Sequence, residues 1–339
     1  MPYLDSFNRP ISYLRVSVTD RCNLRCVYCM PPEGVPWRPH EQILRYEEIE
    51  TVVRAAAGLG ISKVRLTGGE PLVRLGMVDL VAMLARIPGL DDLAMTTNGI
   101  LLARYAEELK AAGLKRVNVS LDTLRPERFR TITRRGELSD TLAGIAAARE
   151  AGLVPVKVNT VVVRGLNDDE VVDFARLTCA PPPPLVAGVG RGEWHVRFIE
   201  VMPLGDNADW AGNGYVPMGE VRARIERELG KLRPARLAAG GGPARYYRLP
   251  GAQGTIGFIT PISEHFCYQC NRLRLTADGK LRPCLLSDYE IDLRTPLRQG
   301  ASAEEIKALI IEGIRNKPER HHLSEQVIPQ GRAMSEIGG

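Results

Sequence analysis

The sequence predicts an α/β fold with a parallel sheet, followed by a smaller module at the C-terminal end. Short runs rich in β-branched residues alternate with helical patterns over the first two thirds of the 339 residues. The chain is 44% hydrophobic and 25% charged, so it carries enough apolar material for a large core. Strands connected in one direction by helices form either an open doubly wound sheet or a full or partial barrel.

The elements of the parallel part follow in order from the N-terminus. The run YLRVSV, residues 13–18, is the first strand, and KVRLT, residues 63–67, is the second. The stretch between them, EEIETVVRAAAGLG at 47–60, has apolar residues at the helical spacing i, i+3, i+4 and i+7: Ile49, Val52, Val53 and Ala56. We expect four more strands within 92–99, 115–122, 154–163 and 193–201. The helices that precede them are expected at 75–87, 100–112, 138–150 and 168–178.

The last third of the chain has a different pattern. A helix near 217–229 is followed by short strand-like runs: RYYRL, GTIGFIT and RLRLTADGKLRPCL. Asp278-Gly279 favours a hairpin turn. We therefore divide the chain into residues 1–229 and an appended α+β module of residues 230–339. The Pro- and Gly-rich run at 180–193 is long for a connection between a helix and a strand, so it is expected to be either functional or disordered.

Charge and hydropathy limit the classes of function. The chain has 45 basic and 40 acidic residues, and a net charge of +5 is too mild for a nucleic-acid-binding surface. A small anionic partner fits better. No export signal or stretch of about 18 apolar residues is present, so we expect a cytoplasmic protein that does not contact the membrane. The basic run RNKPERHHL, residues 315–323, is expected to be a solvated surface.

Polar residues recur at alternate positions of the parallel strands, where two-sided burial would favour unbroken apolar runs. These residues are Arg15, Ser17, Thr19, Lys63, Arg65, Thr67, Arg116, Asn118, Ser120, Asp122, Lys157, Asn159 and Arg197. If they share one face, the sheet encloses a wet, positively charged cavity suited to phosphates or carboxylates. The alternative is that some of these strands are edge strands that face solvent.

Six of the seven cysteines form two groups, which indicates metal or redox-centre ligation in a reducing compartment. The seventh, Cys179, is expected to be an ordinary buried thiol. In the first group Cys22, Cys26 and Cys29 have the spacing Cx3Cx2C. Structural zinc needs four protein ligands, whereas three thiolates can hold a 4Fe-4S cube with one iron open. The motif resembles the signature of radical S-adenosylmethionine (SAM) enzymes, and the aromatic Tyr28 agrees with it.

Two further motifs belong with this one. LTGGEP, residues 66–71, ends the second strand with two glycines and Glu70, as in the radical SAM motif beside the cofactor's amino group. The second cysteine group, Cys267, Cys270 and Cys284, has the spacing Cx2Cx13C. By spacing alone this group also fits a zinc knuckle with a fourth ligand from elsewhere.

Taken together, the motifs resemble the GTP 3′,8-cyclase family of molybdenum cofactor biosynthesis, within the radical SAM superfamily. The resemblance covers nearly the whole chain, through YLRVSVTDRCNLRCVYCMP, VRLTGGEPLVR, TTNG, VNVSLDTL, VKVNTVV, RFIEVMP, FCYQCNRLRLTADGKLRPCL and SEIGG. It implies a partial TIM-type barrel of six β/α units, closed by a C-terminal module. The run at 180–193 is longer than the family usually has there.

Carried over residue by residue, the resemblance assigns a site. The ligands of two 4Fe-4S clusters fall on Cys22, Cys26, Cys29, Cys267, Cys270 and Cys284. The SAM contacts fall on Tyr28, Gly69, Ser120 and Met202. The GTP contacts fall on Arg15, Lys63, Arg65, Thr96, Lys157, Arg197, Arg272 and Arg274. The residues that turnover needs are Arg15, Arg272, Arg274, Gly338 and Gly339.

The resemblance also implies a reaction. A 5′-deoxyadenosyl radical made from SAM takes hydrogen from C3′ of GTP, and the ribose carbon then attacks C8 to give 3′,8-cyclo-7,8-dihydro-GTP. The implied partners are an electron donor such as flavodoxin or ferredoxin, the cyclic pyranopterin monophosphate synthase that receives the product, and a second copy of the chain. Two alternatives stay open: a peptide-modifying radical SAM enzyme with an auxiliary iron-sulfur cluster, and a zinc-binding nucleic-acid protein.

Overall fold

The computed structural model describes residues 2–179, 194–204, 213–236, 241–325, 328–329 and 331–338. The Pro- and Gly-rich run at 180–193 and the terminal Gly339 lie outside these residues. No helix in the described ranges is long and apolar enough to cross a membrane.

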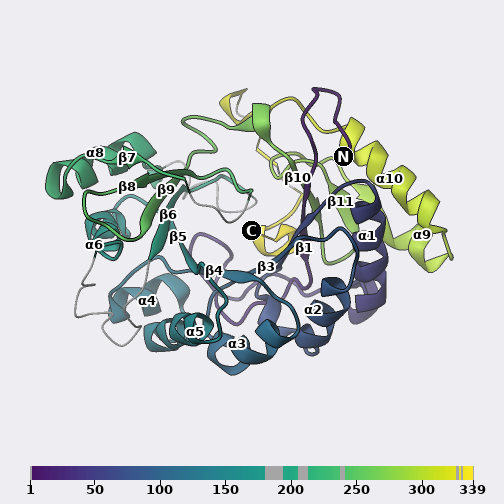
Figure 1. Ribbon diagram of the computed structural model, residues 1–339, viewed down its shortest axis with the longest axis horizontal. Coiled ribbons are helices and arrows are strands. Elements are labelled where there is room, and N and C mark those ends of the chain that lie inside the picture. The colour runs from purple at the N-terminus through teal and green to yellow at the C-terminus, as the bar shows by residue number, and fades with distance from the viewer. Residues whose placement is uncertain are drawn as a thin grey trace.

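Six parallel strands form the centre of the molecule. They are β1 (Tyr13–Ser17), β2 (Lys63–Thr67), β3 (Asp92–Thr97), β4 (Arg116–Ser120), β5 (Lys157–Val162) and β6 (His195–Glu200). They pair in sequence order from β1 to β6, without the reversal of order that defines a doubly wound sheet. The sheet curves as in a barrel, but β1 and β6 each pair on their outer side with another strand (Figure 1). The expected partial barrel is therefore confirmed.

Strands of the last third extend the sheet at both edges. They are β7 (Arg233–Pro234), β8 (Arg245–Arg248), β9 (Thr255–Ile259), β10 (Arg272–Leu275), β11 (Lys280–Arg282) and β12 (Ile291–Asp292). β10 runs parallel to β1, and β9 runs parallel to β6. The expected hairpin joins β10 to β11 with Gly279 in the left-handed region, at φ +82°. The division at residues 229 and 230 stays a prediction.

Helices cover the outer face of the curved sheet (Figure 1). They are α1 (Tyr46–Gly58), α2 (Met77–Ala85), α3 (Leu102–Ala111), α4 (Pro126–Thr133), α5 (Leu138–Glu150), α6 (Val171–Arg176), α8 (Met218–Leu229), α9 (Arg294–Arg298) and α10 (Ala303–Arg315). The short α11 (Met334–Ile337) instead lies near the C-terminus at the centre of the view in Figure 1. The helix expected at 168–178 begins as a 3₁₀ turn at Asp168–Glu170. The sequence did not predict α4, a short charged helix that begins with Pro126.

The apolar residues of the parallel strands face these helices. Val64, Leu66, Val117 and Val119 are at most 1% exposed and belong to the continuous core. The polar residues between them therefore point to the concave side of the sheet.

Candidate functional site

A cavity of about 320 Å³ opens on the concave side of the barrel. All six cysteines of the two groups line it, although the groups are more than 200 positions apart in the sequence. The volume suits a nucleotide-sized ligand. The two cysteine groups thus belong to one site.

The first cysteine group lies in the loop that follows β1. The loop packs directly on the end of β2, where Gly69 donates its N–H to the Thr19 carbonyl at 2.8 Å. A Cβ at Gly69 would lie 2.4 Å from the Arg21 carbonyl oxygen, so a larger residue would push the cysteine loop away. This contact explains why a glycine follows β2 here.

Burial raises the pKa of each thiol in this group. The pKa of Cys22 rises to about 11 and that of Cys29 to about 12, and that of Cys26 is also well above its usual value. Iron or another soft cation would displace these protons, because thiolate is the form that binds metal. The donor set therefore fits an iron-sulfur cluster.

Tyr28 and Asp122 connect the cysteine loop to the end of β4. The Tyr28 hydroxyl donates to Asp122 Oδ2 at 2.5 Å, and Asp122 Oδ1 accepts the Val161 N–H at 2.8 Å. Burial raises the pKa of Asp122 to about 6. Both residues line the cavity. Asp122 was not among the predicted site residues, although the period-two pattern of its strand had placed it on the polar face.

Two buried glutamates position loops at the carboxyl ends of the strands. Glu70 accepts hydrogen bonds from Leu72 N, Thr97 Oγ1 and Asn98 N at 2.7–3.1 Å, and burial raises its pKa to about 7. Glu200, at the end of β6, accepts the N–H groups of Ile262 and Ser263 at 2.9 and 3.1 Å. These carboxylates fix the rim of the cavity, and Glu200 gave no signal in the sequence.

The second cysteine group is held by buried cations. Arg9 donates to the Cys267 carbonyl at 2.7 Å from the N-terminal segment, and Lys317 donates to the Arg272 and Pro283 carbonyls. Burial would raise the pKa of Cys270, but Arg272 and Lys317 outweigh it and lower that pKa to about 6. The expectation that residues 315–323 form a solvated surface is wrong for Lys317, which is 3% exposed and lines the cavity.

Within the part of the chain that the structure describes, no three His, Cys, Asp or Glu side chains converge on a point where one metal ion could be bound. Zinc would require its thiolates at about 2.3 Å from one ion. A 4Fe-4S cube is held by thiolates on separate irons, and three cysteines in each group supply the three thiolates of such a site.

The cavity that the cysteine groups share is also lined by buried arginines with unsatisfied nitrogens. Nε of Arg15, Arg65 and Arg197, and Nη2 of Arg197, are buried with no hydrogen-bond partner among the described residues. Burial and the neighbouring Arg272 lower the pKa of Arg274 to about 10. Burying guanidinium groups without carboxylate partners is costly, and an anionic ligand among them would offset that cost.

Most of the predicted contact residues line this cavity. The structure brings together Arg15, Tyr28, Arg65, Gly69, Thr96, Ser120, Arg197, Met202, Arg272 and Arg274. Met202 lies beyond the end of β6, as expected.

Three predicted inward-facing cations do not line the cavity: Lys63, Arg116 and Lys157. Each is the first residue of its strand, whereas the cavity lies toward the opposite ends. Arg116 instead makes a buried ion pair with Asp92 on β3. Lys157 is 2% exposed, and burial together with Arg197 lowers its pKa to about 6.

The C-terminal tail, defined here as residues 331–338, returns to the concave side of the sheet. Arg274 donates to the Gly338 carbonyl at 2.7 Å. A Cβ at Gly338 would lie 2.5 Å from Thr67 Cγ2, so only glycine fits between β1 and β2 there. The Ser335 N–H donates to the Cys29 thiol. The tail thus contacts both the basic residues and a cysteine of the first group.

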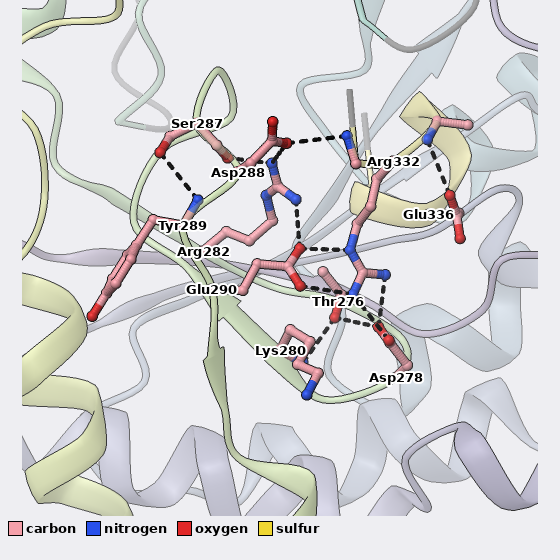
Figure 2. A network of polar contacts seen from close by, with 12 residues as sticks. Thr276, Asp278, Lys280, Arg282, Ser287, Asp288, Tyr289, Glu290, Arg332 and Glu336 are labelled. Carbon is pink, nitrogen blue, oxygen red and sulfur yellow. Dashed lines mark hydrogen bonds and ion pairs between the residues drawn. The ribbon is translucent and has the colours of Figure 1, made fainter. Parts of the chain in front are cut away.

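Ion pairs anchor this tail to the turn of the β10–β11 hairpin and to the segment before β12 (Figure 2). Arg332 pairs with both oxygens of Asp278 at 3.0 Å and with both oxygens of Glu290 at 2.5 and 2.9 Å. Arg38, from the loop after the first cysteine group, pairs with Glu336 at 2.8 Å. The sequence gave no sign of this anchor.

Family models match the chain in two consecutive segments. Residues 16–178 match the Radical SAM superfamily, and residues 194–323 match Molybdenum Cofactor Synthesis C. The first segment contains the first cysteine group, and the second contains the other. As a radical SAM protein, the chain uses SAM and an iron-sulfur cluster.

Curated relatives match the chain over its whole length. A GTP 3′,8-cyclase of Pelotomaculum thermopropionicum is 59% identical over 335 residues, which are 99% of both chains. A GTP 3′,8-cyclase of Moorella thermoacetica is 56% identical over 335 residues, again 99% of both. The chain belongs to the GTP 3′,8-cyclase family. The family expected from the motifs is confirmed, and the zinc-binding nucleic-acid alternative has no support.

A solved structure shows the same fold at low sequence identity. SuiB of Streptococcus suis, bound to its precursor peptide SuiA, superposes with a TM-score of 0.58 at 14% identity, over 92% of this chain and 67% of that one. Such a likeness concerns the fold alone. It does not support the peptide-modifying alternative, because relatives that share more than half of their residues with this chain are cyclases.

Proposed function

We propose that the protein converts GTP to 3′,8-cyclo-7,8-dihydro-GTP, the first step of molybdenum cofactor biosynthesis. One observation carries the proposal: two groups of three cysteines share a single cavity, which is also lined by Arg15, Arg65 and Arg197, each with at least one buried guanidinium nitrogen that has no hydrogen-bond partner among the described residues. A triphosphate supplies the negative charge that these groups lack. The identity to GTP 3′,8-cyclases over the full chain supports the same substrate.

The site would hold two 4Fe-4S clusters, one on each cysteine group, with SAM beside the first. When bound, they supply the electron that cleaves SAM and the 5′-deoxyadenosyl radical that takes hydrogen from the ribose. The proposed SAM contacts line the same cavity as the first group: Tyr28, Gly69, Ser120 and Met202.

The chain's own residues bind and orient the nucleotide. Arg15, Arg65, Arg197, Arg272 and Arg274 line the cavity and would neutralise the triphosphate and hold the ribose in place. The remaining proposed GTP contacts are Thr96, which lines the cavity, and Lys63 and Lys157, which do not. Burial lowers the pKa of Lys157, so Lys157 would act through the charge that it gains when a triphosphate binds and raises that pKa. Gly338 and Gly339 complete the proposed set, and they leave room for the substrate because they have no side chains.

The proposal extends to the protein's surroundings. A one-electron donor such as flavodoxin or ferredoxin would reduce the first cluster, and the product would pass to cyclic pyranopterin monophosphate synthase. We place the protein in the cytoplasm as a homodimer, with a barrel of residues 1–229 and a module of residues 230–339. These assignments are supported by the family alone.

Anaerobic turnover tests the proposal. Protein reconstituted with iron and sulfide should convert GTP in the presence of SAM and dithionite, and should form one 5′-deoxyadenosine for each product molecule. A variant with Cys267, Cys270 and Cys284 all changed to serine should keep about half of the iron and lose GTP conversion. Zinc in place of iron in anaerobically prepared protein would rule out the radical reaction.

A further inference from the structure

Lys317 is a buried lysine at the second cysteine group. It lies two residues after the end of α10 and is 3% exposed. Its Nζ donates to the Arg272 carbonyl at 2.9 Å and to the Pro283 carbonyl at 2.5 Å. The side chain lines the cavity that the cysteines share.

These two carbonyls belong to the segments that carry two of the cysteines. Arg272 follows Cys270 by two residues, and Pro283 immediately precedes Cys284. One ammonium group therefore joins the segments before and after the β10–β11 hairpin. If this ammonium group were displaced, both Cys270 and Cys284 could move.

The charge of Lys317 has no carboxylate to offset it. No Asp or Glu among the described residues lies within 4.0 Å of its Nζ. Arg9 is a useful contrast, because it also donates to a carbonyl of this group but pairs with Asp5 at 2.6 Å. The positive charge of Arg9 is balanced by Asp5 in the same segment, whereas the charge of Lys317 is not balanced by a carboxylate of the described residues.

A buried ammonium group needs a nearby negative charge, because burial removes its hydration. The charge of Lys317 acts on the thiols of Cys267 and Cys270. Three thiolates outweigh the positive charge of an oxidised 4Fe-4S cube, and reduction adds a further electron. The net charge around a cluster is one of the properties that set its reduction potential.

We propose that Lys317 is a positioning residue that joins the Cys270 and Cys284 segments and supplies the fixed positive charge that raises the reduction potential of the second cluster. The inference rests on the proposed function only in assuming a cluster at this cysteine group. Lys317 has no assigned contact with SAM or GTP. Its role is to make the reduced state of the second cluster accessible.

A redox titration of the anaerobically reconstituted full-length protein, followed by electron paramagnetic resonance, tests this role. The signal that is missing when Cys267, Cys270 and Cys284 are all changed to serine reports the second cluster, and the signal that remains reports the first. Lys317→Gln removes the charge but keeps donor groups, and Lys317→Arg keeps the charge. Lys307→Gln is the matched control, because Lys307 is on α10 and pairs with Glu304 at the surface.

At the parent's midpoint potential, Lys317→Gln should lower the ratio of reduced to oxidised second cluster at least tenfold, which is 59 mV for a one-electron couple. The first cluster should be unaffected, and Lys317→Arg and Lys307→Gln should match the parent. Loss of second-site iron in Lys317→Gln but not in Lys317→Arg would also support the role of charge.

Two results would overturn the inference: an unchanged second-cluster potential in Lys317→Gln, or equal loss of second-site iron in both Lys317 variants. The second result would mean that the exact shape of lysine matters and its charge does not. Absence of iron from the second site of the parent itself would count against the proposed function instead. Iron content therefore distinguishes the two failures.

Discussion

Replacing Arg332 with methionine should release the C-terminal tail from the cavity. The change removes all four contacts that the guanidinium makes with Asp278 and Glu290, at 2.5–3.0 Å. Methionine keeps most of the apolar stem, so the loss is mainly one of charge and hydrogen bonds. The Arg38–Glu336 pair and the Arg274–Gly338 contact would then be the main polar attachments of the tail.

The structure sets the size of the effect. Removing one partner of a buried ion pair costs about 3–5 kcal/mol. The two carboxylates keep other partners here, since Asp278 accepts from Thr276 Oγ1 at 2.6 Å and Glu290 pairs with Arg282 at 2.5 Å. We therefore expect the lower end, about 3 kcal/mol, which would reduce the equilibrium constant for tail docking by about 100-fold.

Hydrogen-deuterium exchange is the direct assay. The amides of Glu336 and Gly338 donate to carbonyls within the tail, so they should exchange much faster in Arg332→Met. GTP turnover should fall while iron content stays the same. Arg320→Met is the control, because Arg320 is exposed and pairs with Glu325. If exchange and turnover in Arg332→Met match those of the control, the anchor does not hold the tail and the reasoning fails.

Two further predictions concern the substrate side of the cavity. Burial and Arg197 lower the pKa of Lys157 to about 6, and a bound triphosphate would raise it again. GTP binding at pH 7.5 should therefore take up about one proton, and the affinity for GTP should fall as the pH rises. Calorimetry in two buffers of different ionisation enthalpy should show this proton uptake in the parent but not in Lys157→Met. Equal heats in both buffers for the parent would contradict it. Gly338→Ala should lower kcat/KM more than tenfold without loss of iron, because the added Cβ meets Thr67. Gly300→Ala is the control and should leave kcat/KM unchanged, because Gly300 also has a positive φ but a Cβ there would have no neighbour within 4 Å.

The strands and their polar faces could be predicted because their signals are local. Alternation along β1, β2 and β6 placed Arg15, Arg65 and Arg197 on the concave face, and these three side chains do line the cavity. The same rule misplaced Arg116, because alternation gives the face of a strand but not the height of a residue along the barrel. At the start of β4, Arg116 meets Asp92 instead.

The residues that hold the site together gave no such signal. Lys317 and Arg332 act on partners that are 34 to 54 positions away, and Arg9 acts on carbonyls more than 250 positions away. Neither composition nor periodicity distinguishes a buried cation of this kind from a solvated one. The pairing of β10 with β1 could not be predicted for the same reason, because the two strands are separated by most of the chain.

Isotope transfer tests the central claim most directly. GTP carrying deuterium at C3′ should be incubated anaerobically with the reconstituted protein, SAM and dithionite, and the 5′-deoxyadenosine analysed by mass spectrometry. The account predicts that 5′-deoxyadenosine acquires one deuterium as GTP is consumed. Unlabelled 5′-deoxyadenosine formed while GTP is recovered unchanged would contradict it.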